Sequence, residues 1–429
     1  MSAALRGWRL NIVASCLAFV TYFCMYGFRK PFAAATYETT GWLGLDAKTA
    51  FVTSQVLGYT LSKFVGIKWV SEVSRAARLR LLIGLVLLAE IALLGFAVLP
   101  GLGKMASIFL NGLPLGMIWG LVVRYLEGRR SSELLLAALS CSFIVASGAV
   151  KDTARWLLDA GVPEYWMPAL TGLIFLPPLA LAAKLLDRVP DPDSSDVAER
   201  EARPAMHARE RRAFATRFLP GLLLLLGVYL GLTAFRDYRD NYGVELFEEL
   251  GYAREPALFS RTELPVAAVV LLVLGASSGV RDRVRGLLTV FGVMTAGLAS
   301  IGAATFALRA GWISGQIWMI GIGLGGYLAY VPFSSFLFDR IMAATRFAGT
   351  AVFAVNLADA VGYSGSVGML LFKDLLARDT SRLLFFTNWS YVLSVLGSTG
   401  LLLAAAYFWR QARHASLATH RGEAAPPRA

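Results

Sequence analysis

Long apolar runs recur along the whole chain, and short polar stretches separate them. Each run is close to the roughly 20 residues that an α-helix needs to cross a bilayer. The runs are continuous rather than alternating, which argues against a membrane β-barrel. The pattern therefore predicts an all-α membrane protein in the lipid bilayer, with twelve transmembrane helices near 9–36, 49–70, 79–99, 104–127, 132–155, 166–187, 217–246, 263–280, 286–308, 311–338, 347–371 and 386–410.

One long polar segment lies near the middle and leaves six runs on either side. It begins with Pro, Asp and Ser and continues with Arg and Glu, as in a linker followed by a short solvated helix. The end of the chain is also polar, and we expect it to be disordered. The predicted parts are a six-helix half at 1–187, a cytoplasmic linker at 188–216, a second six-helix half at 217–410 and a tail at 411–429.

Two short matches indicate that the halves are repeats. The first pairs Tyr22, Phe28 and Arg29 with Tyr229, Phe235 and Arg236, at an offset of 207 residues. The second pairs Gly112, Trp119 and Arg129 with Gly323, Tyr330 and Arg340, at an offset of 211. Chance similarity between glycine-rich helices is the alternative. Matched arginines near membrane helix ends favour one polar site that both halves build.

Composition agrees with the membrane assignment. The mean hydropathy is +0.58 and only 16% of residues are charged, against about a quarter in soluble domains. The net charge of +12 comes from basic residues that cluster in alternate connections. The positive-inside rule then predicts cytoplasmic termini, and we expect a bacterial inner membrane location. Nucleic-acid binding is unsupported, because no soluble basic domain is present.

The reactive side chains argue against enzyme chemistry. Three cysteines lie in apolar runs without disulfide or metal spacing, and the three histidines lie in the linker or tail. No phosphate-cradling loop and no nucleophile–base constellation is present. We expect no enzyme activity, no metal and no cofactor, and a monomer.

Several stretches resemble a known superfamily. Twelve spans, a basic central loop and the sequence Arg281-Asp282-Arg283-Val284-Arg285-Gly286 are similar to the major facilitator superfamily. Within it, YGFRKPFAAA from Tyr26 and GYTLSKF from Gly58 resemble the first two helices of the organophosphate:phosphate antiporters. The resemblance implies the major facilitator fold, with Arg236 at the second substrate arginine. The fifth span lacks those antiporters' histidine, and Asn241, beside Asp240, stands where they carry an aspartate.

The residue chemistry points to an anion site. Arginine offers a planar fork of donors that suits phosphate or carboxylate, so Arg29 and Arg236 could hold one anion between the halves. Lys63 and Lys30 would add point charges. Hydroxyl donors would come from Tyr22, Tyr26 and Tyr229.

Structural alternatives stand beside each assignment. Arg29 and Lys30 could flank the first span at the outer interface, and Arg236 could pair with Asp237 or Asp240. Lys63 could pair with a carboxylate. Candidates for coupling or cavity lining are Asp240, Asn241, Asn356, Asp359, Trp119 and Tyr330, of which the last two could simply be packing residues.

The sequence thus predicts a secondary transporter that moves a small anionic, phosphorylated metabolite by alternating access and anion exchange. Two alternatives stay open. One is a transporter-like membrane sensor of a phosphorylated metabolite. The other is a proton-coupled or facilitative carrier of a carboxylate or neutral solute.

Overall fold

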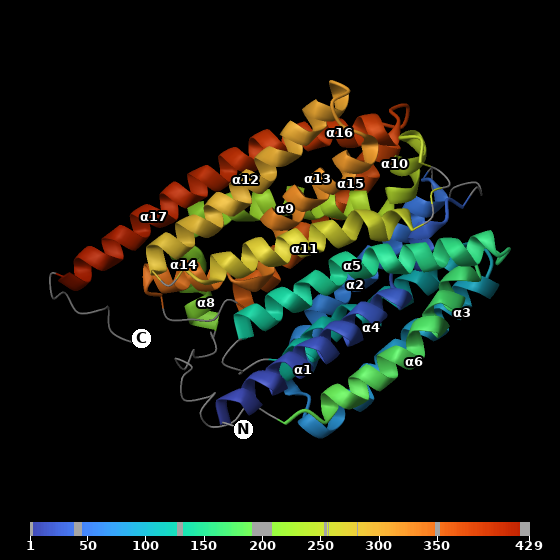
Figure 1. The fold of residues 1–429 in the computed structure, drawn as a ribbon, viewed down its shortest axis with the longest axis horizontal. Helices are drawn as coiled ribbons and strands as arrows, with labels where there is room; N and C mark the ends of the chain where they lie inside the picture. Colours follow the sequence, from blue (N-terminus) through green and yellow to red (C-terminus); the bar gives the residue numbers. More distant parts are fainter. Residues whose placement is uncertain are drawn as a thin grey trace.

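The computed structural model describes residues 3–37, 45–126, 132–190, 208–252, 255, 257–280, 282–347 and 352–420. Within these helices the side chains of residues 3–9, 63–72, 132–138, 208, 278, 352 and 417–420 are not described. The regular structure in these parts is helical, and the start of the first described helix and the end of the last one lie toward the same end of the molecule (Figure 1).

The first half contains six long helices and a broken turn. Its elements are α1 (Ala3–Met25), η1 (Tyr26–Phe28), η2 (Pro31–Ala34), α2 (Ala47–Glu72), α3 (Arg75–Val98), α4 (Leu102–Leu126), α5 (Ser132–Asp159) and α6 (Met167–Asp187). Helix α2 begins where the Asp46 carboxylate accepts a hydrogen bond from the Thr49 amide, which satisfies one of the unpaired donors of the first turn.

The second half repeats this arrangement with shorter helices inserted. Its elements are α8 (Ala208–Arg217), α9 (Leu219–Asn241), α10 (Gly243–Glu249), α11 (Leu258–Ser278), α12 (Arg283–Arg309), α13 (Gly315–Ser335), α14 (Leu337–Thr345), α15 (Val352–Leu375), α16 (Arg382–Val392), the π-helical turn η3 (Leu393–Gly397) and α17 (Ser398–His420). Helix α8 occupies the end of the linker, where the sequence predicts a short helix.

Nine membrane spans in the described part of the chain are long and apolar enough to be recognised from these properties alone. Three more helices carry more polar residues, and α2, α5 and α15 have 26, 28 and 24 residues. Each is longer than the roughly 20 residues that span a bilayer. Together they give the twelve-helix membrane fold that the sequence predicts.

The two halves pack as separate bundles that meet along two seams. In the first half α4 contacts α2 and α3, and in the second α13 contacts α11 and α12. Between the halves, α5 lies against α11 (Figure 1). Helix α2 packs against α15 as well. The site is therefore built where helices from both bundles face each other.

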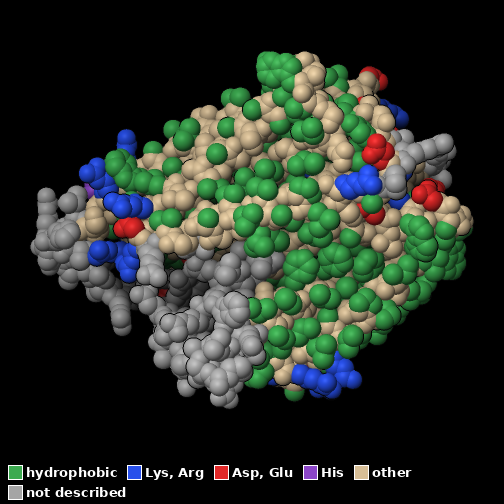
Figure 2. All heavy atoms as spheres, viewed as in Figure 1, with side chains coloured by type: hydrophobic (Ala, Val, Ile, Leu, Met, Phe, Trp, Pro, Cys, Tyr) green, Lys and Arg blue, Asp and Glu red, His purple; other side chains and the backbone are tan. Residues whose placement is uncertain are grey.

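The apolar helices α3, α6, α12 and α17 lie on the outside. Ile91 of α3 is 63% exposed and Leu181 of α6 is 60% exposed. Hydrophobic side chains cover much of the visible face, whereas charged groups gather at its ends (Figure 2). This surface matches lipid.

One expectation about the chain end is wrong. The polar tail was predicted to be disordered from residue 411, yet α17 continues to His420. A nucleated helix extends through polar residues at little cost, because each further residue adds one backbone hydrogen bond. Residues 421–429 lie outside the described part.

Candidate anion-binding site

Arg29 lies in a break at the end of the first membrane helix. The Pro31 ring cannot continue the α-helical hydrogen-bond ladder, and the chain forms the 3₁₀ turns η1 and η2 instead. The Arg29 amide donates to the Tyr26 carbonyl at 3.0 Å, and Gln55 Nε2 donates to the Arg29 carbonyl at 3.0 Å. The break therefore holds the arginine backbone in a defined turn inside the protein.

The Arg29 side chain is buried among tyrosine rings. Its Cζ lies 4.0 Å from the ring centroid of Tyr59 and 5.7 Å from that of Tyr26. The Tyr59 ring in turn contacts Tyr363 of α15, with centroids 5.1 Å apart. Arg29 is only 5% exposed, so it does not anchor the outer interface.

No carboxylate in the described part of the chain forms an ion pair with Arg29, and its Nε has no hydrogen-bond partner there. A buried guanidinium is costly unless an anion compensates it, although aromatic faces offset part of this cost. The geometry therefore leaves a strong donor available to an anionic ligand.

Arg236 occurs in a different local structure. It lies inside α9, and its Nε and Nη2 donate to Asp237 Oδ1 at 3.1 and 2.7 Å. Ser366 of α15 donates to the other carboxylate oxygen at 2.7 Å. The Arg236 Cζ also lies 4.1 Å from the Tyr330 ring centroid. The internal pair that the sequence left open is thus present, and the charge of Arg236 is already compensated.

Four of the predicted aromatic residues form equivalent contacts in the two halves. Tyr22 meets Trp119 edge to face with centroids 4.8 Å apart, and Tyr229 stacks on Tyr330 at 5.2 Å. These are the positions that the internal repeat relates. Phe143 of α5 contacts both Trp119 and Tyr330, so a continuous aromatic surface joins the Arg29 and Arg236 regions.

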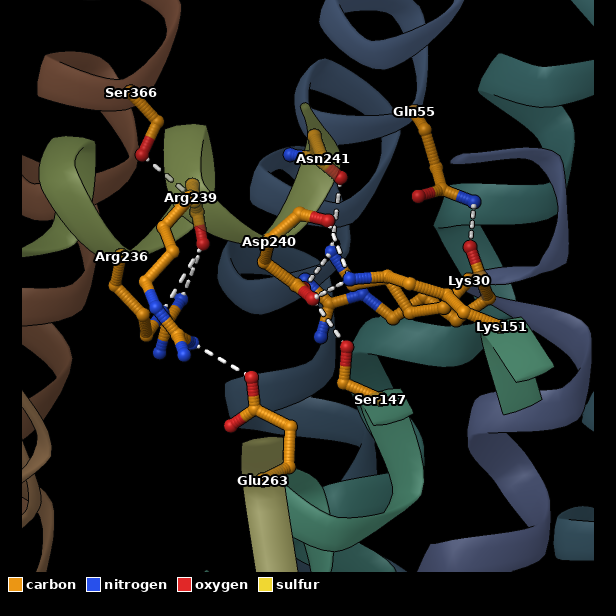
Figure 3. A network of polar contacts seen from close by, with 12 residues as sticks. Lys30, Gln55, Ser147, Lys151, Arg236, Arg239, Asp240, Asn241, Glu263 and Ser366 are labelled. Carbon is orange, nitrogen blue, oxygen red and sulfur yellow. Dashed lines mark hydrogen bonds and ion pairs between the residues drawn. The ribbon is translucent and has the colours of Figure 1, made fainter. Parts of the chain in front are cut away.

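A second polar cluster closes around Asp240 (Figure 3). Lys30 and Lys151 both approach its carboxylate at 2.5 Å, and Ser147 donates to the same group. Lys30 also donates to Asn241 Oδ1 at 3.0 Å. These contacts join the turn between η1 and η2, together with α5 of the same half, to α9 of the other half.

A buried ion pair lies one helical turn away from Arg236. Arg239 donates to Glu263 of α11 at 2.7 Å and to the Met319 carbonyl at 2.9 Å. Gly323 gives the guanidinium room, since a Cβ there would lie 2.6 Å from Nη2. This pair connects three helices of the second half and acts as a structural tie.

The remaining predicted residues separate into three cases. Asp359 accepts a hydrogen bond from the Tyr229 hydroxyl at 2.7 Å. Asn356 lies one turn earlier on α15 and is partly buried. Lys63 belongs to α2, but its side chain lies outside the described residues.

Sequence reasoning missed five residues of this region: Tyr59, Lys151, Arg239, Glu263 and Tyr363. Charged residues within apolar spans were the available signal for three of them, because such residues are rare and functional by default. Lys151 lies in the fifth span, which lacks the histidine that the organophosphate:phosphate antiporters carry there. The two tyrosines carried no comparable signal, since tyrosine is common in buried helices.

The cluster has an excess of positive charge. Its cations are Arg29, Lys30, Lys151, Arg236 and Arg239, and its carboxylates are Asp237, Asp240, Glu263 and Asp359. These residues include one more cation than carboxylates. Arg29 is the cation that forms no ion pair with any of these carboxylates. An arrangement of this kind favours an anion over a neutral or cationic ligand.

Comparison with known proteins places the chain in a family. A sequence profile described as a family of unknown function (DUF5690) matches residues 31–411. The chain belongs to DUF5690. No curated protein sequence matches it.

Solved structures show the fold of this DUF5690 protein. It is similar to a D-xylose-proton symporter, with a TM-score of 0.61, 14% identity and coverage of 94% of this chain and 97% of that chain. For a proton-dependent oligopeptide transporter the values are 0.62, 13%, 95% and 100%. For the human organic anion transporter MFSD10 they are 0.56, 13%, 92% and 99%. The DUF5690 protein therefore has the major facilitator fold of two six-helix halves.

Proposed function

We propose that this protein is a secondary transporter that moves a small anionic metabolite across the membrane by alternating access of its two halves. Arg29 carries this proposal: it is buried, is faced by Tyr59 and Tyr26, and forms no ion pair within the described residues. A planar guanidinium in this setting suits a phosphate or carboxylate group.

The position of Arg29 supports transport rather than simple binding. Its neighbour Tyr59 contacts Tyr363 of the opposite half, and the next residue, Lys30, pairs with Asp240 of that half. A ligand at Arg29 would thus touch the boundary whose opening and closing alternating access requires. The named solute carriers of similar fold support a transporter class, without identifying its solute.

We propose a phosphorylated solute and exchange of one anion for another. The similarity of YGFRKPFAAA and GYTLSKF to the organophosphate:phosphate antiporters supports this choice. Unequal roles for the two arginines fit the described contacts: Arg29 has no ion-pair partner among the described residues, whereas Arg236 already donates to Asp237.

The test is anion binding by the purified protein, followed by counterflow in proteoliposomes. Inorganic phosphate and sulfate should raise the unfolding temperature of the wild type, because a ligand stabilises the state that it binds. Neutral sugars should not. Arg29→Gln should lose the effect, whereas Arg413→Gln in α17 should keep it. Stabilisation by neutral solutes alone, or an Arg29→Gln response equal to wild type, would reject the proposal.

A further inference from the structure

Glu90 is a buried carboxyl group in the middle of α3, a helix whose outer face meets lipid. It is 4% exposed, and neither Oε1 nor Oε2 has a hydrogen-bond partner in the described part of the chain. An ionised carboxylate in such surroundings is very unfavourable, so the group is stabilised by binding a proton. No function described above uses it.

A glycine on a neighbouring helix leaves room for the Glu90 carboxyl group. Gly172 of α6 lies opposite, and a methyl group there would overlap Glu90 Oε2. The same position faces Phe28 of η1, whose Cδ1 would lie 3.1 Å from that methyl group. Glu90 therefore points toward the turn that precedes Arg29, rather than toward lipid.

Charged groups on the packed elements lie well away along the helices. Elements α4, α6 and η1 pack on α3. The Lys104 ammonium is bound at the Phe96 carbonyl, six residues or about 9 Å along the helix from Glu90. At the other end of α4, Arg124 donates to the Val73 carbonyl, and Tyr125 donates to the Asp187 carboxylate. Lys184 lies one turn before Asp187 on α6. On α3 itself the charged residues are Arg75, Arg78 and Arg80, and the charge that follows η1 is Arg29.

One side chain ties the Glu90 position to the Arg29 position. Asn111 Nδ2 of α4 donates to the Phe28 carbonyl at 3.0 Å and to the Ala89 carbonyl at 3.1 Å. Arg29 and Glu90 are the residues that directly follow these two carbonyls. Gln55 then joins Asn111 Oδ1, at 2.8 Å, to the Arg29 carbonyl, at 3.0 Å.

We propose that Glu90 is a proton-binding site whose protonation is linked to anion binding at Arg29. This inference rests on the proposed function of the Arg29 site. Ionisation of Glu90 would place a negative charge behind the turn that carries Arg29, in a medium of low dielectric constant, and would repel the anion. Linkage is reciprocal, so a bound anion favours the proton on Glu90, and each anion that is exchanged carries a proton with it.

The test measures sulfate affinity of the full-length protein from mildly acidic to mildly alkaline pH, because sulfate keeps its charge over this range. The wild-type Kd should rise about tenfold with pH, within the range usual for coupled sites. Glu90→Gln mimics the protonated group and should bind at the acidic-limit affinity at every pH. Glu90→Asp should keep a pH dependence, and Glu255→Gln, at an exposed position, should behave as wild type.

The outcomes separate the two proposals. Equal pH dependence in wild type and Glu90→Gln, or loss of binding at all pH values in a folded Glu90→Gln protein, overturns the linkage. Absence of sulfate binding by the wild type at any pH instead rejects the proposed function. The proton site has an independent readout: infrared spectra should show a protonated-carboxyl C=O band that Glu90→Gln removes. An unchanged band would overturn the assignment.

Discussion

The Lys30 ammonium lies 2.5 Å from the Asp240 carboxylate, and so joins the turn after α1 to the end of α9. Lys30 directly follows Arg29, and Asp240 lies four residues after Arg236 in the other half. The same end of the molecule carries a second link, Lys48 to Glu245 at 2.6 Å. The halves are therefore held together at the end away from the chain termini (Figure 1).

Asp240→Asn should loosen this closed end. It would leave Lys30 and Lys151 without their carboxylate, and breaking a buried pair costs on the order of 3–5 kcal/mol. The population should shift toward states open at this end. A cysteine placed at buried Ala34, in a protein otherwise free of cysteine, should then react faster with a maleimide. Asp282→Asn, at a distant helix cap, should leave the rate unchanged, and an equal rate in Asp240→Asn would contradict the closure role.

Arg29→Lys should weaken phosphate binding more than Arg236→Lys does. Lysine keeps the charge at position 29 but loses the planar donors, and each charge-assisted hydrogen bond is worth on the order of 1.5–3 kcal/mol. The Kd should rise by roughly one to three orders of magnitude, since about 1.4 kcal/mol is tenfold. The Arg236 change should act less on affinity because Asp237 already occupies two of its donors. Calorimetric titration of both variants checks the order, and the reverse order would refute the unequal roles.

Glu263→Gln should lower the thermal stability of the second half. The change leaves Arg239 buried without its carboxylate, with an expected loss on the order of 3–5 kcal/mol. The double variant Arg239→Met/Glu263→Met should recover most of the unfolding temperature, because it removes both charges. Thermal unfolding in detergent measures the unfolding temperature of the single and the double variant. A double variant as unstable as Glu263→Gln would show that packing, rather than charge pairing, dominates.

Gly112→Ala should separate α2 from α4. Its Cβ would overlap the Gln55 carbonyl oxygen and lie 2.9 Å from the Tyr59 amide, both of which are backbone atoms that cannot move independently. Overpacking of this kind costs about 1–3 kcal/mol. Gly292→Ala is the matched control, because nothing lies within 4 Å of its Cβ. The control should be neutral or slightly stabilising, since alanine favours helix. Equal unfolding temperatures for the two variants would contradict close α2–α4 packing.

Reporter fusions test the orientation. We expect both termini and residues 188–216 on the cytoplasmic side, because arginine is concentrated in the connections at that end. A reporter active only in the cytoplasm should work at either terminus. Activity of an external reporter there would overturn the orientation.

Sequence reasoning reached the fold because its determinants are local. Run length defines twelve spans, and the polar linker separates two halves. The repeat also related Tyr22 to Tyr229 and Trp119 to Tyr330, which form equivalent contacts in the structure. A hydrophobic run needs no knowledge of its neighbours to be recognised, since its preference is for lipid over water.

Only the tertiary structure decided which charges meet. The sequence drew attention to Arg29 and Arg236 as a matched pair, yet α9 places Asp237 on Arg236, whereas Pro31 turns Arg29 among tyrosines. The local sequence around Lys151 gives no signal of its partner Asp240, and the sequence around Glu90 gives no signal of that residue's burial. The interaction energy of a buried charge depends on groups from other helices, at distances that helix packing alone determines. For this protein the sequence by itself determined the spans and their duplication. The packing of the helices determined which of Arg29 and Arg236 has no ion-pair partner among the described residues.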